Sequence, residues 1–211
     1  GGTSLLLLLQ ELRRLSIDID IIVPKSVKIA EINEILKNIV RTSSFTRYEE
    51  QERHLSQIPK AHFKLFYESP FNQSEVYVLL DVLFEENPYS RLDSTDIVCP
   101  FIDTIPPNVT VKVPSIADIL GDKLTAFAPN TTGILYDKEK EMEIIKQLFD
   151  IESLFDQLST TNGVKDTFIR CAEQELNYRQ LTEMNYENVL DDIFKTAIII
   201  GGRGSFDKET F

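Results

Sequence analysis

The chain has 211 residues, of which 42% are hydrophobic and 27% charged, and its net charge is −12. This is the composition of a globular protein, and it excludes a disordered chain, a collagen-like repeat and a small disulfide scaffold. The negative charge excludes broad, non-specific binding to nucleic acid, because phosphate neutralisation supplies most of that affinity. The charge is uneven, +2 over residues 1–64 and −14 over residues 65–211. The simpler interpretation is two differently solvated halves, but a local contact between the first half and an anion stays open.

No targeting or membrane-spanning segment is expected. The longest aliphatic run, Leu5 to Leu9, falls far short of the ~20 residues that a membrane helix needs, and it has no basic lead-in. Cys99 and Cys171 do not form a pair motif, which suits a reducing compartment. We therefore expect a cytoplasmic protein without membrane contact.

The first elements alternate between helix and strand. A glycine turn leads into a predicted short helix from Leu5 to Leu15, and the alternating, β-branched run from Ile17 to Val23 predicts a strand. Apolar residues at helical spacing between Ile32 and Val40 predict a helix that packs on this strand. Residues 61–68 and 75–84 predict two further strands. The second is almost wholly apolar and is therefore expected to be central in the sheet.

The later elements are mostly helical. Residues 85–114, rich in Pro, Asp and Ser, predict short strands at most, and Ser115 opens a helix with Asp118 in a capping-box arrangement. A helical pattern continues from Glu139 to about Ile200. The glycine-rich stretch at residues 201–205 lacks the lysine of a phosphate loop and predicts a helix end instead. This order predicts an α+β fold with a mixed α/β domain at 1–113 and a helical domain at 114–211.

Asp18 and Asp20 are the sharpest chemical feature. Two residues apart on a strand, their side chains leave on one face, while isoleucines occupy the other face. Two carboxylates in such a strand repel each other unless a cation lies between them, and Mg²⁺ prefers oxygen ligands. The alternative is an edge strand with a solvated polar face.

Asp81 strengthens the metal hypothesis. It lies inside the apolar run from Val78 to Phe84, where a lone carboxylate needs a partner. A third acid beside Asp18 and Asp20 would complete a site for two Mg²⁺ ions, which align the attacking and leaving oxygens in nucleotidyl transfer. The alternative is an aspartate at the exposed end of a shorter strand.

Two further motifs suggest binding of phosphate. Gly1, Gly2, Thr3 and Ser4 form a glycine turn at a helix start, where backbone N–H groups favour an anion. The alternative is a plain turn with a Ser/Thr cap. Lys123 lies among apolar helix positions and would reach a triphosphate as a point charge, although a surface lysine is the commoner case.

Other catalytic patterns are not found. His54 and His62 have no cysteine or second histidine at ligand spacing, so a structural zinc site is not expected. No Ser or Cys nucleophile motif is present either.

The order of these motifs resembles a known family. The run Gly-Gly-Thr-Ser-Leu, followed by Arg14 to Asp20, is similar to the signature of the AbiEii/AbiGii toxin family within the DNA polymerase β-like nucleotidyltransferase superfamily. The resemblance continues through Asp81, through the lysine-bearing helix Ile119 to Phe127, and through Lys146 to Ile151.

This resemblance implies a nucleotidyltransferase-type mixed sheet with flanking helices, followed by a helical domain. It also implies Mg²⁺-dependent use of a nucleoside triphosphate, an RNA acceptor such as tRNA in some relatives, and a cognate antitoxin in a toxin–antitoxin or phage-defence pair. By position, the glycine turn would hold phosphates and the three aspartates would hold metal. Asp81 would in addition help to deprotonate the acceptor hydroxyl, and Lys123 would neutralise the triphosphate. Asp150 matches the second aspartate of the last motif.

The chain departs from the family at two places. Gln147 stands where the family has the first aspartate of the last motif, and an amide carries no charge. The helix and strand that usually precede the glycine motif are also expected to be missing from this sequence.

Two rival functions stay open. One is a catalytically silent nucleotide-binding module that acts through a protein partner. The other is a nucleotide-sugar transferase, which also uses the Asp-x-Asp pattern. For a transferase acting on RNA, the best candidate for the surface that binds the acceptor is residues 37–64. This segment contains three glutamates and six basic residues, which are Lys37, Arg41, Arg47, Arg53, Lys60 and Lys64.

Overall fold

A computed structural model describes residues 1–11, 13–51, 58–101, 103–136, 139–203 and 205. The chain divides into two compact units, Gly1–Asn87 and Pro88–Phe211, which we describe separately.

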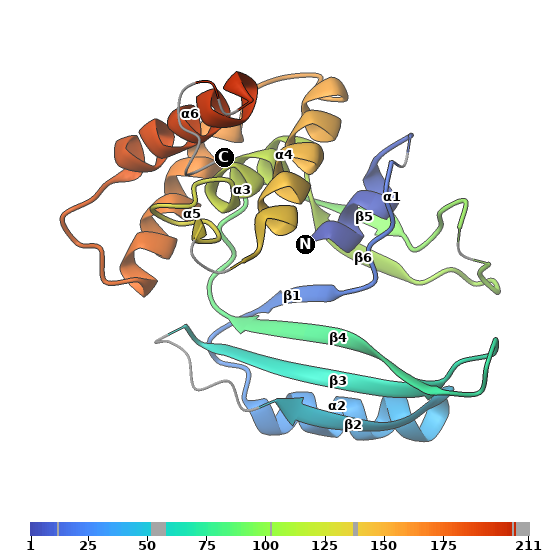
Figure 1. Ribbon diagram of the computed structural model, residues 1–211. Helices are drawn as coiled ribbons and strands as arrows, with labels where there is room; N and C mark the ends of the chain where they lie inside the picture. The colour runs from blue at the N-terminus through green and yellow to red at the C-terminus, as the bar shows by residue number, and fades with distance from the viewer. Residues whose placement is uncertain (12, 52–57, 102, 137–138, 204, 206–211) are drawn as a thin grey trace. The chain divides into compact units, whose positions relative to one another are not determined.

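The first unit is built on a four-stranded mixed sheet (Figure 1). Its strands are β1 (Ile19–Val23), β2 (Phe45–Gln51), β3 (Lys60–Glu68) and β4 (Glu75–Phe84). The spatial order is β1-β4-β3-β2, with β1 parallel to β4 and the other pairs antiparallel. The apolar strand β4 is interior, as its sequence predicts, and β2 is a strand that the sequence analysis did not identify.

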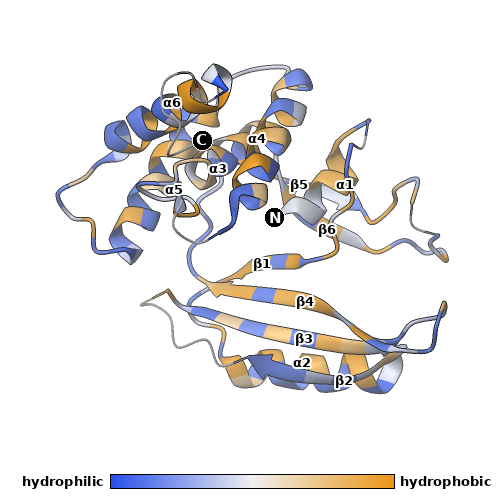
Figure 2. Ribbon diagram, viewed as in Figure 1, coloured by the Kyte–Doolittle hydropathy of each residue, from blue (hydrophilic) through white to orange (hydrophobic). Residues whose placement is uncertain are grey.

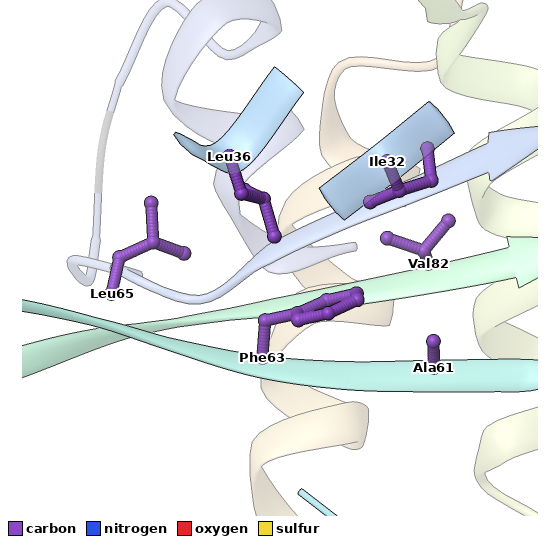
Figure 3. Packing of buried hydrophobic residues seen from close by; sticks show 6 residues of the cluster. All are labelled: Ile32, Leu36, Ala61, Phe63, Leu65 and Val82. Atoms are coloured by element: carbon purple, nitrogen blue, oxygen red, sulfur yellow. The ribbon is translucent and has the colours of Figure 1, made fainter. Parts of the chain in front are cut away.

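Helix α2 (Ile29–Thr42) covers one face of this sheet. It begins where the Glu31 carboxylate accepts the backbone N–H of Lys28, at 2.8 Å. Figure 3 shows the buried core between helix and sheet, which consists of Ile32, Leu36, Ala61, Phe63, Leu65 and Val82. Successive side chains of a strand point to opposite faces, so the neighbours of these strand residues lie on the other face. Figure 2 shows this alternation of apolar and polar residues along β3.

The predicted helix from Leu5 to Leu15 is wrong in length. A 3₁₀ turn, η1 (Gly2–Ser4), runs into α1 (Leu5–Leu8), and the helix stops before Leu9, whose own backbone is extended with φ and ψ of −84° and 132°. Leu5 and Leu6 are buried, whereas Leu15 is 63% exposed, so a helix continued to Leu15 would gain no burial there to stabilise it.

The second unit combines a β-hairpin with four helices. Its elements are β5 (Leu92–Asp96), β6 (Thr110–Pro114), α3 (Ile116–Ala126), α4 (Glu141–Asp156), α5 (Val164–Tyr178) and α6 (Tyr186–Gly202). Ser115 caps α3 by accepting the N–H of Asp118, as predicted. Helix α6 ends at Gly202, followed by Arg203 with φ of 48°, which confirms that the glycine-rich stretch terminates a helix.

The division between the units falls earlier than the expected boundary at 113/114. Strand β6 pairs with β5 and contacts α3, so the hairpin belongs with the helices. The buried Asp118 carboxylate also accepts the backbone N–H groups of Ser90 and Arg91, at 2.8 and 3.2 Å. These contacts tie residues 88–114 to the second unit. None of the helices in the described part of the chain is long and apolar enough to cross a membrane.

Candidate active site

Asp20 and Asp81 are direct neighbours across the parallel pair of β1 and β4. Val23 and Val82 pack toward α2, so by alternation both aspartates lie on the face that α2 leaves open. Their side chains are 49% and 31% exposed, respectively. Two carboxylates at register positions on strands about 4.8 Å apart repel each other and favour a bound cation.

Asp18 directly precedes β1 and is exposed. Its backbone carbonyl accepts a hydrogen bond from the Thr3 hydroxyl, which joins the glycine turn to the start of the strand. The two predicted motifs therefore meet at one edge of the sheet, since β1 is an edge strand.

The glycine turn lies against Asp20. A Cβ atom on Gly1 would lie 1.6 Å from Oδ2 of Asp20, and one on Gly2 would lie 2.7 Å from Oγ of Ser16. A side chain at either position would have to displace Asp20 or Ser16, so glycine lets the turn lie this close to them. The Ser4 hydroxyl donates to the Gly1 carbonyl at 2.7 Å. Because α1 is a single turn, its dipole is small, and any phosphate binding here depends on the backbone N–H groups of the turn.

His62 is a site residue that the sequence analysis missed. It pairs in register with Asp81, and its Nδ1 lies 2.7 Å from Oδ1 of Asp81. In the sequence, His62 stands out only as a possible zinc ligand without partners at ligand spacing. The alternation in β3 places it on the face opposite Ala61 and Phe63, but nothing local indicates that β3 pairs with β4 in this register.

The donor chemistry of Asp20 and Asp81 fits a hard divalent cation. Within the described residues, no group of three His, Cys, Asp or Glu side chains has the arrangement of a metal site. The structure therefore does not assemble Asp18, Asp20 and Asp81 as such a group. Asp20 and Asp81 alone are a donor set that Mg²⁺ can use, because it commonly takes one or two carboxylates and completes its shell with substrate phosphates and water.

Lys123 and Asp150 form a buried ion pair within the second unit. Their Nζ and Oδ2 atoms are 2.9 Å apart, and the side chains are 12% and 1% exposed. Gln147 accepts a second hydrogen bond from Lys123 at 3.0 Å. The departure from the family motif thus keeps a hydrogen-bond acceptor for Lys123 but adds no second negative charge beside it.

The predicted acceptor patch is partly neutralised. Arg47 pairs with Glu49 and Glu75, and its guanidinium lies 3.5 Å from the centroid of the Phe66 ring. The hydrogen bond between Arg47 and Glu75 raises the pKa of the arginine and lowers the pKa of the glutamate. Lys37 likewise pairs with Glu34 at 2.6 Å, and Arg53 lies outside the described residues.

A sequence model of the nucleotidyl transferase AbiEii toxin, of type IV toxin–antitoxin systems, matches residues 1–202. The chain belongs to the AbiEii family. Membership assigns the chain to the nucleotidyl transferases and to the toxins of toxin–antitoxin pairs. The observed fold, a mixed sheet with flanking helices, is the one that the sequence predicts for such an enzyme.

Other comparisons add little to the AbiEii assignment. No curated protein matches the sequence. Among solved structures, the crystal structure of JHP933 from Helicobacter pylori is similar over 83% of each chain, with 13% identity and a TM-score of 0.39. A likeness of this extent supports no functional inference.

Proposed function

We propose that this AbiEii-family protein moves a nucleoside monophosphate from a nucleoside triphosphate to a hydroxyl acceptor, with Mg²⁺ as cofactor. The observation that carries the proposal is the register pairing of Asp20 with Asp81, beside a glycine turn whose Gly1 lies close against the Asp20 carboxylate. An RNA such as tRNA is the acceptor class that we favour.

Asp18, Asp20 and Asp81 would hold the Mg²⁺, as two ions, which would offset negative charge on the phosphates. The backbone N–H groups of Gly1 to Ser4 would bind phosphate oxygens next to Asp20. Asp81 would accept the proton of the acceptor hydroxyl.

Lys123 would contribute positive charge toward the triphosphate. An ammonium group has three hydrogens, and Asp150 and Gln147 accept two of them. The third hydrogen is the one that a phosphate oxygen would take. Asp150 would orient Lys123 through their ion pair.

The biological setting follows from the family. We propose a cytoplasmic toxin with a cognate antitoxin, in a system that serves phage defence. The net charge of −12 limits any RNA contact to a local patch, because a broad acidic surface repels phosphates.

The test is transfer of label from each α-labelled nucleoside triphosphate, in turn, to total tRNA in the presence of Mg²⁺. Asp20→Asn and Asp81→Asn remove one charge each at nearly constant shape. Glu68→Gln, an exposed acid at the far end of β3, is the matched control. We expect label in RNA from the wild type and the control, and a loss of about 100-fold or more in both aspartate variants, since such a site acts mainly by electrostatic stabilisation.

Two results would redirect the proposal. Binding of nucleotide without release of pyrophosphate would favour the silent nucleotide-binding module. Binding of a sugar nucleotide in preference to a plain triphosphate would favour the nucleotide-sugar transferase.

A further inference from the structure

A row of polar residues crosses the open face of the sheet. Asp20 of β1 pairs with Asp81 of β4, Asp81 pairs with His62 of β3, and His62 pairs with Gln51 of β2. Figure 1 shows the four strands in this order. His62 is therefore the neighbour of Asp81 on the side away from Asp20.

The hydrogen bond between His62 and Asp81 has a definite direction. An ionised carboxylate only accepts, so Nδ1 of His62 is the donor and Oδ1 of Asp81 is the acceptor, at 2.7 Å. The terminal torsion of an aspartate is broad, and a hydrogen bond to one oxygen restricts it. With Oδ1 held by His62, Oδ2 is the oxygen left for another ligand.

The donor is rigidly placed. His62 stands between Ala61 and Phe63, which are 6% and 0% exposed and anchor β3 in the core under α2. Its own side chain is 15% exposed, compared with 31% for Asp81 and 49% for Asp20. Exposure thus rises along the row from the histidine to the two carboxylates.

We propose that His62 is a positioning residue that fixes the Asp81 carboxylate for cation binding beside Asp20. This inference rests on the proposed function, because it assumes that Asp81 holds the cation. Side chains that hydrogen-bond to metal ligands commonly raise metal affinity 10- to 100-fold, through orientation of the ligand.

The first test is the affinity of the full chain for Mn²⁺ alone, measured by electron paramagnetic resonance without nucleotide. His62→Phe keeps a ring of similar volume and removes the donor, and His62→Asn keeps an N–H near the position of Nδ1. Tyr77→Phe, on the same strand and face as Asp81, is the matched control. We expect His62→Phe to weaken Mn²⁺ binding about 10-fold or more, and His62→Asn to stay within about 3-fold of the wild type.

Asparagine favours strands less than phenylalanine does, so a purely structural role predicts the opposite ranking of the two variants. Wild-type affinity in His62→Phe, together with loss in Asp81→Asn, would overturn the role of His62 and leave the proposed metal site standing. Unchanged affinity in Asp81→Asn would overturn both the role of His62 and the metal site.

A second readout follows His62 itself. The chain has two histidines, so a His54→Gln variant assigns the imidazole ¹⁵N signals of His62. Addition of Mg²⁺ should move the Nδ1 signal of His62 in the wild type, and should leave it unmoved in Asp20→Asn, because the cation no longer reaches Asp81. The inference would be overturned if the His62 signal did not move at Mg²⁺ concentrations that fully displace bound Mn²⁺ from the protein.

Discussion

The buried pair of Lys123 and Asp150 makes the sharpest stability prediction. Asp150→Asn removes the negative charge and leaves the ammonium of Lys123 with neutral amides at positions 147 and 150. The Asp150 side chain is 1% exposed and the Lys123 side chain 12% exposed, so water screens the change little. Loss of one partner from a buried ion pair typically costs about 3–5 kcal/mol.

The expected cost lies near the lower end of that range. Lys123 keeps its hydrogen bond to Gln147 at 3.0 Å, and its partial exposure lets water reach the ammonium. We therefore expect a loss of about 3 kcal/mol in the free energy of unfolding. With a urea dependence of about 2 kcal/mol per molar, this moves the unfolding midpoint down by about 1.5 M.

The assay is urea unfolding followed by circular dichroism at 222 nm. It is applied to Asp150→Asn and to a double-mutant cycle made of Lys123→Met, Asp150→Leu and their combination. Lys123→Met alone should destabilise at least as much as Asp150→Asn, because Asp150 is the more buried of the two. The combination of Lys123→Met with Asp150→Leu should recover to within about 1 kcal/mol of the wild type, since an apolar pair avoids the cost of burying charge. A loss under about 0.5 kcal/mol in Asp150→Asn, or strictly additive single variants, would refute the reasoning.

Three further predictions concern packing, acid stability and the glycine turn. Gly121→Ala should cost about 1–3 kcal/mol, because the new Cβ would lie 2.6 Å from the Val164 carbonyl; thermal unfolding measures it. Burial of Asp118 raises its pKa, but hydrogen bonds from two hydroxyls and two backbone N–H groups outweigh burial and hold the pKa below its ordinary 3.8. The stabilisation by Asp118 is thus fully present above that value and lost as pH falls through the folded-state pKa, so Tm of the wild type should fall more steeply below about pH 4 than Tm of Asp118→Asn. Gly1→Ala should displace Asp20, whose Oδ2 would lie 1.6 Å from the new Cβ, and should weaken Mn²⁺ binding; unchanged affinity would contradict the close approach.

The structure also narrows the acceptor hypothesis. Arg47 is one of the basic residues of the 37–64 patch. In the structure it forms ion pairs with Glu49 and Glu75, and its guanidinium lies over the Phe66 ring. Charge reversal at Arg47 would therefore disturb these local contacts as well as any RNA contact. Lys64, whose Nζ lies 4.3 Å from the centroid of the Tyr77 ring, is the cleaner position for that test. Reduced acceptor use with unchanged nucleotide binding in Lys64→Glu would support the patch.

Local patterns in the sequence were enough to predict strands β1, β3 and β4, the main helices and the faces on which their side chains lie, but not β2. The apolar run around Asp81 predicts an interior strand, and Ser115 before Asp118 predicts a helix start, because periodicity and capping act over a few neighbouring residues. The resemblance to the AbiEii family likewise rests on short motifs in a fixed order, and the family assignment confirms it.

Which of these residues meet depends on tertiary contacts. The pairing of Asp81 with both Asp20 and His62 depends on strand order and register, and the ion pair of Lys123 with Asp150 depends on the packing of α3 against α4. The early end of α1 has the same origin, since the Thr3 hydroxyl hydrogen-bonds to the backbone carbonyl of Asp18, a residue distant along the chain. Register and packing are set by the burial of apolar surface summed over segments far apart in the chain, and no short stretch of sequence contains that sum.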